Sequence, residues 1–193
     1  MAFWKKEKRV FVAVAILAIF FAWAIVLYEI PPTEIVASVG IHNGYLLAFF
    51  SAVLGGTSIL FPFPYYLGVF TLAAGGLNPF LLAVVAGTGV VIGDSTSYLV
   101  GYSGREILTG KTQLIFKRLY EWSLKKPKWV LTLVLYLYPA LSPLPNDFIM
   151  IPMGLARFPY FRLIIPMWFG NMTFNLWIAL AGIYGFDGIF LNG

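Results

Sequence analysis

The sequence has no cysteine, a single histidine and few charged residues. The absence of cysteine excludes disulfides and thiolate metal sites, and His42 has no neighbouring metal ligands, so neither a metal nor another cofactor is expected. Charged residues make up 11% of the 193 residues, whereas a soluble domain carries about 25%. No formal charge occurs between Glu34 and Asp94, so this stretch must be buried in a bilayer or in protein. The composition therefore predicts an integral membrane protein.

The net charge of +5 does not indicate a nucleic-acid partner. The basic residues stand at the ends of apolar segments rather than on a face interleaved with exposed aromatic residues. We expect anionic lipid headgroups as their counter-charge. No linker rich in serine and glycine or in acidic residues divides the chain, so residues 1–193 are predicted to form one domain.

The first apolar segment, Val10 to Tyr28, follows a basic stretch in the order of a signal peptide. It is longer than the usual hydrophobic region of such a peptide, however, and would span about 28 Å as a helix. No small-x-small cleavage site precedes Glu29. We interpret residues 1–40 as an uncleaved first span and an outer loop, ahead of a core over residues 41–185.

Three segments are long enough to cross a bilayer as single helices. They are Val10 to Tyr28, Pro79 to Tyr102 and Leu163 to Phe186.

Two further apolar segments, about residues 44–76 and 129–156, are each interrupted by a Pro-x-Pro pair. Two prolines one residue apart remove two amide donors and disfavour helix for the residues before them. The flanking pieces, such as Trp129 to Tyr138 before Pro139, have roughly 10 to 12 residues and are too short to span alone. Each segment predicts a re-entrant hairpin, and the alternative is a kinked ordinary span. The prolines that would line a pathway at the hairpin tips are Pro62, Pro64, Pro143 and Pro145.

The distribution of charge favours the re-entrant topology. Suppose that the N-terminus is cytoplasmic, that the first hairpin enters from outside, and that the second enters from the cytoplasm. All 13 Lys and Arg residues then lie inside, and Glu29, Glu34 and Asp187 lie outside. The predicted fold is an all-α membrane protein with three full transmembrane helices and two opposed re-entrant hairpins, expected in the plasma membrane. Five or six conventional crossings are the alternative.

The two halves of the chain resemble each other. Each has a Pro-x-Pro pair, an apolar stretch, a glycine, a proline followed by an aromatic residue, and a long span. Pro143 is the counterpart of Pro62 in this pattern. We call the separation in sequence between these two residues the repeat offset. Together with the opposite insertion of the hairpins, this pattern predicts an inverted repeat, as in many secondary transporters.

Asp94 would lie about 12 Å inside its span, measured from Tyr102 along the helix. A centred carboxylate costs about 2.5 to 3.5 kcal/mol on insertion scales, so it should face a partner, a hydrated cavity or a proton. A purely structural alternative is an Asp satisfied by Ser or Thr hydroxyls or by Arg157.

Asp147 follows Asn146 directly after the second interruption. Its carboxylate would either cap the new helix or hold a headgroup or a proton at the hairpin tip. We therefore place Asp147 and Asn146 beside Asp94 on the predicted pathway.

Three arginines are candidate headgroup contacts: Arg105, Arg157 and Arg162. Snorkelling at the membrane interface is the simpler alternative for the last two. Residues 110–128 alternate apolar and basic side chains, as in a helix that lies on an anionic membrane surface.

These motifs resemble the two conserved blocks of DedA/VTT-domain membrane proteins, also called SNARE-associated proteins, over roughly residues 45–185. The first block runs from Phe61-Pro62-Phe63-Pro64 through Gly93-Asp94 to Gly104-Arg105, and the second from Pro143-Leu144-Pro145 through Gly170-Asn171 to Trp177. The resemblance implies two opposed re-entrant hairpins and an activity in lipid scrambling, undecaprenyl-phosphate recycling or proton-coupled transport. Its expected partners are membrane lipids and a proton or another coupling ion.

The sequence departs from this pattern at both hairpins. Tyr65 and Tyr66 stand where the first hairpin usually carries a glutamate, and Ala140 and Asn146 where the second usually carries two arginines. These departures weaken the inference of phosphate binding and proton coupling.

Three classes of function follow from the sequence. The first is a scramblase, flippase or transporter, and the second is a structural or assembly protein for which neither aspartate matters. A membrane enzyme is disfavoured because the sequence shows no Ser/His/Asp set, metal cluster or paired-carboxylate motif.

Overall fold

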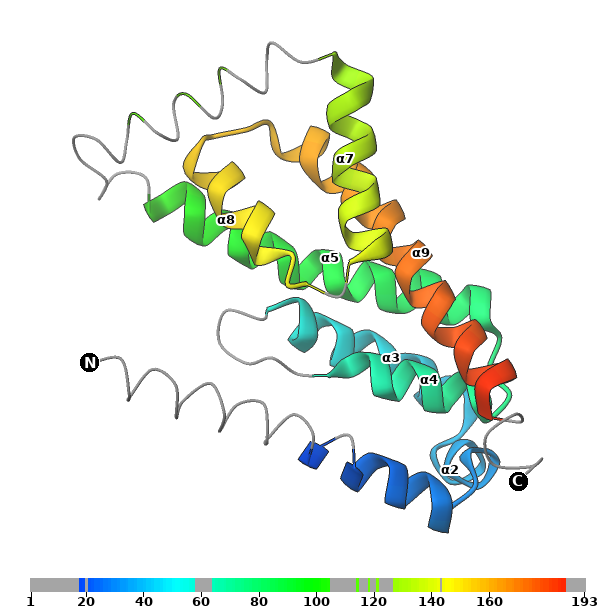
Figure 1. Cartoon of the computed structure of the whole chain (residues 1–193). Coiled ribbons are helices and arrows are strands. Elements are labelled where there is room, and N and C mark those ends of the chain that lie inside the picture. The colour runs from blue at the N-terminus through cyan, green and yellow to red at the C-terminus, as the bar shows by residue number, and fades with distance from the viewer. Residues whose placement is uncertain are drawn as a thin grey trace, which may run out of the picture.

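The structure is a computed structural model that describes residues 18–19, 21–57, 64–104, 114, 118, 121, 127–142 and 144–186. Within these ranges the chain is helical and has no strand (Figure 1). Residues 21–29 are helical and precede α2 (Pro32–Val39) and α3 (Ile41–Gly56). The later helices are α4 (Tyr65–Ala74), α5 (Pro79–Gly104), α7 (Lys128–Leu141), α8 (Asp147–Leu155) and α9 (Tyr160–Phe186).

Two of the three expected spans are continuous apolar helices. At about 1.5 Å per residue, α5 and α9 each extend about 40 Å, enough to cross a hydrocarbon core of about 30 Å. The bent pair of α2 and α3, with 98° between the two helices, would make a third crossing if it formed one span. Most of the expected first span, Val10 to Tyr28, lies outside the described residues. The described chain therefore has two or three helices that can cross a membrane.

The predicted interruptions are present. In the first half, helix stops at Gly56 and resumes at Tyr65, with Pro64 as the N-cap residue of α4. The chain folds back on itself, because Gly55 lies against the ring of Tyr65 and Gly44 lies against Leu72. Pro62, Pro143 and Arg105 lie outside the described residues.

In the second half the helix ends directly before the Pro-x-Pro pair, as predicted, but it is longer than the expected piece from Trp129 to Tyr138. Helix α7 does not end at Tyr138 but continues through Pro139 to Leu141. Pro139 is buried against Gly170 of α9, and the lack of a side chain at that glycine makes room for the proline ring. The tip of this hairpin is held by the Tyr138 hydroxyl, which donates to the carbonyl oxygen of Pro145 at 3.0 Å.

The repeat seen in the sequence is also a structural repeat. The first residues of α5 and α9, Pro79 and Tyr160, are separated by the repeat offset, and so are the turns that precede these helices. In these turns, Leu77 N–H donates to Leu72 O at 3.1 Å and Phe158 N–H donates to Met153 O at 2.9 Å.

The residue before each donor in these turns has positive φ. It is Gly76 in the first repeat, at 98°, and Arg157 in the second, at 54°. The same backbone turn is thus built with a glycine in one repeat and an arginine in the other.

The two repeats pack by exchanging their second hairpin helices. Helices α3 and α7 each pack on the long helix of their own repeat, α5 and α9 respectively. Helices α4 and α8 instead pack on the long helix of the other repeat, α9 and α5. Figure 1 shows the two hairpins on opposite sides of α5. This exchange is what a two-fold relation between the repeats produces.

Glycines allow the exchanged helices to approach closely, as small residues do between helices in a membrane. A methyl group at Gly101 of α5 would overlap the carbonyl oxygen of Ile151 in α8. A methyl group at Gly182 of α9 would likewise overlap the carbonyl oxygen of Phe70 in α4. The two contacts are equivalent, because the repeat offset relates Gly101 to Gly182 and Phe70 to Ile151.

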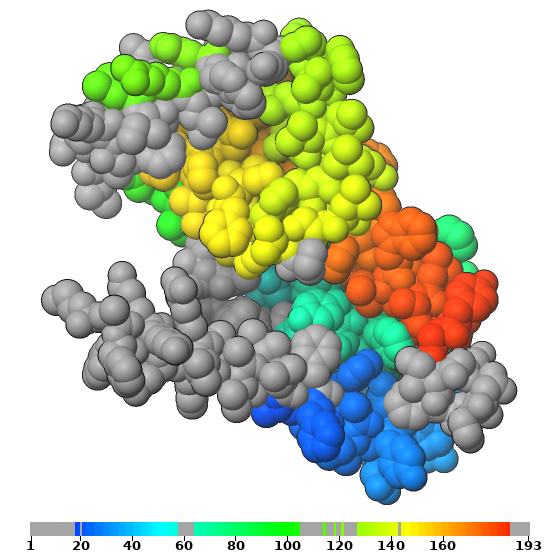
Figure 2. All heavy atoms as spheres, in the orientation of Figure 1, coloured from blue at the N-terminus to red at the C-terminus, as the bar shows by residue number. Residues whose placement is uncertain are grey.

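Residues 21–39 pack outside the repeats, next to α4 (Figure 2). The Trp23 indole N–H donates to Thr71 Oγ1 at 3.0 Å, and the Trp23 ring meets Phe70 edge-on. Gly75, at the end of α4, lies against Pro32 and Val36 of α2. The expected outer loop therefore contains a helix.

Candidate functional site

The centre of the site is Asp94, a carboxyl group in the middle of α5 whose side chain is 1% exposed. Asp94 Oδ2 accepts hydrogen bonds from Asn146 Nδ2 at 2.7 Å and from Asn171 Nδ2 at 3.2 Å. Asn146 Nδ2 also donates to Asn171 Oδ1 at 3.0 Å, which closes a ring of three side chains. Among the described residues, Asp94 is thus held by two neutral amides and by no cation.

These partners differ from the structural alternative that the sequence suggested for Asp94, which was a Ser or Thr hydroxyl or Arg157. Arg157 instead stacks over the Tyr102 ring, with its guanidinium carbon 5.0 Å from the ring centroid. The amides of Asn146 and Asn171 come from the tip of the second hairpin and from α9, so Asp94 joins three segments.

Asp147 lies beside this ring but is not the helix cap. Asn146 is the N-cap residue of α8, and its side chain makes no capping hydrogen bond because its amide is directed to Asp94 and Asn171. Asp147 is the first residue of the helix, where a negative charge is favoured by the helix dipole. One of its contacts is with Ser97 of α5, whose hydroxyl donates to Asp147 Oδ1. Ser97 is fully buried.

The polar chain continues to the tip of the first hairpin through Asn175. Asn175 is fully buried, and its Nδ2 donates to Asn171 O at 2.8 Å and to the Tyr65 hydroxyl at 3.4 Å. No described residue hydrogen-bonds to its Oδ1. An unpaired buried carbonyl oxygen is uncommon in native structures because it forfeits its hydration. Tyr65 opens α4, directly after Pro64.

The structure thus joins some of the predicted site residues and separates others. Asp94, Asn146 and Asp147 meet at the tip of the second hairpin, and Pro145 lies in the same tip. Pro64 lies at the tip of the first hairpin.

Two of the three candidate headgroup contacts are among the described residues, and both lie at the surface. Arg157 and Arg162 are exposed. Arg162 lies about 14 Å from Asn171 along the axis of α9.

Four residues of the site were not predicted: Tyr65, Ser97, Asn171 and Asn175. Tyr65, Asn171 and Asn175 stand in mostly apolar stretches, and Ser97 stands in the polar run Asp94-Ser95-Thr96-Ser97, so no periodic pattern distinguishes them. The repeat carried a usable signal, however. The repeat offset makes Asn175 the counterpart of Asp94, and Asn146 the counterpart of Tyr65. The Asn146–Asp94 and Tyr65–Asn175 hydrogen bonds are therefore equivalent contacts.

This arrangement places two carboxylates, three amides and two hydroxyls at the junction of both hairpin tips with both long helices. Such oxygen-rich groups can bind a proton, a cation, or the hydroxyl and amine groups of a headgroup. Among the described residues, no group of three His, Cys, Asp or Glu side chains is placed to hold a metal ion.

Comparison with protein-family profiles, with curated proteins and with solved structures gives no match for this chain.

Proposed function

We propose that this protein is a transporter of the DedA type, not an enzyme, which moves a lipid or a small solute across the plasma membrane through its paired hairpins. The observation that supports this proposal is the buried polar chain from Tyr65 to Asp94. It joins both hairpin tips halfway along α5, where a membrane-spanning helix would be surrounded by hydrocarbon.

The place of the two aspartates in the proposed membrane interior supports a functional interpretation, because Asp94 is buried and Asp147 is half-buried. A carboxylate at the centre of a bilayer costs about 2.5 to 3.5 kcal/mol on insertion scales, and such residues mark substrate or ion pathways by default. Apolar residues would fill the same space without that cost. The chain nevertheless has Asp94 and Asp147 on facing segments, and Asn175 Oδ1 has no described partner in the same polar chain.

The repeat supports the same proposal. In many transporters, inverted repeats bring discontinuous helices together near the bilayer midplane, and the binding site lies between them. We place the first hairpin as re-entrant from outside and the second as re-entrant from the cytoplasm, with the N-terminus cytoplasmic. Backbone that is not helical is tolerated at membrane depth only where protein or a hydrated cavity surrounds it. The break between Leu141 and Asp147, next to the polar cluster, fits that condition.

The test is flux through purified protein reconstituted into vesicles, with a fluorescent phospholipid as the probe. Asp147→Asn and Asp94→Asn keep the size of the side chain and remove its charge. We expect each to reduce the rate about tenfold or more, the equivalent of about 1.4 kcal/mol in the barrier. The matched control is Glu34→Gln, which removes an exposed carboxylate on α2 and should leave the rate unchanged.

Monodisperse Asp147→Asn and Asp94→Asn proteins that move the probe at the unmutated rate would contradict the proposal. They would favour the structural or assembly role, in which the hairpins only pack and neither carboxylate matters.

A further inference from the structure

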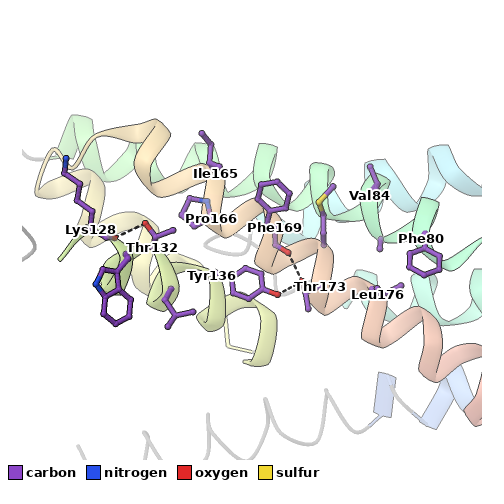
Figure 3. Close-up of a pocket in the computed structure, with 14 residues that line it drawn as sticks. Phe80, Val84, Lys128, Thr132, Tyr136, Ile165, Pro166, Phe169, Thr173 and Leu176 are labelled. Carbon is purple, nitrogen blue, oxygen red and sulfur yellow. Dashed lines mark hydrogen bonds between the residues drawn. The ribbon is translucent and has the colours of Figure 1, made fainter. Parts of the chain in front are cut away.

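A groove lies on the surface of the helix bundle, separate from the polar cluster. It has a volume of ≈ 960 Å³ and is lined by α5, α7 and α9. Figure 3 shows Lys128 at one end of the groove and Phe80 and Leu176 at the other, with Phe169 between them.

The walls of the groove present carbon rather than hydrogen-bonding groups. Its hydroxyl groups already have partners within the protein: Thr132 Oγ1 donates to Lys128 O at 2.9 Å, and Tyr136 Oη lies 3.0 Å from Thr173 Oγ1. The lining therefore suits a hydrocarbon chain better than a polar solute.

Charge is confined to one end. Among the described residues that line the groove, Lys128 is the only formally charged one, and it is exposed at the first residue of α7. Trp129 follows it and is 69% exposed, as expected of an aromatic residue at a membrane interface. An occupant with an apolar chain and an anionic group at one end would complement this distribution.

The α9 wall of the groove is about as long as one leaflet of a bilayer is thick. From Ile165 to Leu176, the lining residues of α9 extend about 16 Å along the helix. Half of a hydrocarbon core of about 30 Å is about 15 Å. With Lys128 at headgroup level, the α9 wall of the groove covers about the thickness of one leaflet, and the α5 wall continues to Phe80, the second residue of that helix.

We propose that this groove binds one acyl chain of an anionic phospholipid from the leaflet at which Lys128 lies, with the lipid phosphate on the Lys128 ammonium group. The inference rests on the proposed membrane location and does not require transport. The bound lipid is distinguished from bulk lipid by its retention on the purified protein.

The experiment measures lipid that stays on the protein by native mass spectrometry. Purified protein is equilibrated with an equal mixture of phosphatidylglycerol and phosphatidylcholine and then released into the gas phase. We expect the unmutated protein to retain one phosphatidylglycerol in preference to phosphatidylcholine. Lys128→Gln should reduce that preference about fivefold, the effect of one basic residue near an anionic membrane surface. Lys128→Arg, which keeps a positive charge at the same position of the groove, should leave it unchanged.

A second pair of variants tests the groove itself. Val84→Trp introduces a large side chain at a groove residue that is 44% exposed, and should reduce the retention of both lipids. Val100→Trp makes the same change on the same helix, at a residue that is 57% exposed and does not line the groove. It should retain lipid as the unmutated protein does.

Equal retention by the two tryptophan variants, or a phosphatidylglycerol preference that survives Lys128→Gln, would overturn the proposal. Conversion of a dimer to a monomer by Val84→Trp, without loss of lipid, would also overturn it and would show that a second copy of this chain covers the groove. Each of these outcomes is independent of flux, so this proposal and the transport proposal can fail separately.

Discussion

Tyr65 and Asn146 are equivalent residues of the two repeats, and each hydrogen-bonds to the same position of the other repeat's long helix. Asn146 donates to Asp94 of α5 at 2.7 Å, and Tyr65 accepts from Asn175 of α9 at 3.4 Å. One contact is short and involves a carboxyl group, and the other is long and involves neutral groups. The two halves of the site therefore share their geometry but differ in strength.

This difference predicts unequal effects of two substitutions. Asn146→Ala removes a donor from a buried carboxyl group and should lower the free energy of unfolding by about 1 to 3 kcal/mol. No capping hydrogen bond is lost with it, because the Asn146 side chain makes none. Tyr65→Phe removes a hydrogen bond at the limit of useful length and should cost less than about 1 kcal/mol. Thermal unfolding in detergent measures both.

The control for this comparison is Asn43→Ala, which removes an exposed asparagine whose side-chain amide donates to the carbonyl oxygen of Val39. It should have little effect. Equal losses of stability for Asn146→Ala and Tyr65→Phe would mean that the Asn146–Asp94 contact is no stronger than its counterpart.

The helices and their interruptions could be predicted because they depend on local chemistry. Paired prolines stop a helix wherever they stand, and long apolar runs predicted α5 and α9 closely. Pro139 shows the limit of this reasoning. It stays inside α7 because it packs on Gly170, a contact between residues on different helices that no local rule describes.

The site could be predicted only in part for a similar reason. Asp94 and Asp147 stand out because charge is rare in this chain, whereas Asn171 and Asn175 are ordinary polar residues in a long apolar helix. Their importance comes from the exchange of α4 and α8 between the repeats, which brings the hairpin tips to both long helices. The matching motifs of the two halves predicted a repeat, but not which helices would be exchanged.

The exchanged contacts should depend on glycine. Gly101→Ala and Gly182→Ala each place a methyl group against a backbone carbonyl oxygen that cannot rotate away. We expect each to lower the free energy of unfolding by about 1 to 3 kcal/mol, as overpacking does, with a matching fall in melting temperature. Because the two positions are equivalent in the repeats, their effects should be similar.

Gly68→Ala is the matched control for these variants. Gly68 lies within α4, and a methyl group there would meet nothing within 4 Å. Since alanine favours helix over glycine by about 1 kcal/mol, this change should be neutral or stabilising. A loss of stability at Gly68 as large as that at Gly101 would show that helix glycines are required here for a reason other than close packing.

The last prediction concerns the way in which the hairpins enter the membrane. Asn78 and Pro159 are exposed residues in the equivalent turns that precede α5 and α9. They lie at opposite ends of α5, because Asn78 directly precedes the helix, whereas Phe158 O accepts a hydrogen bond from the Tyr98 hydroxyl near its other end. If α5 crosses the bilayer and both hairpins are re-entrant, Asn78 faces outside and Pro159 faces the cytoplasm. If both hairpins are instead kinked spans, each adds a crossing, and the two turns fall on the same side.

The absence of native cysteine makes this a direct experiment with single thiols. Asn78→Cys should react with a membrane-impermeant maleimide added outside intact cells, and Pro159→Cys should react only after the membrane is opened. Ser38→Cys is the control, since residue 38 is exposed on α2 and lies outside in both topologies. Its labelling from outside shows that the reagent has access and that the chain is inserted. Labelling of positions 78 and 159 from the same side would establish conventional crossings and remove the inverted repeat on which the transport proposal partly rests.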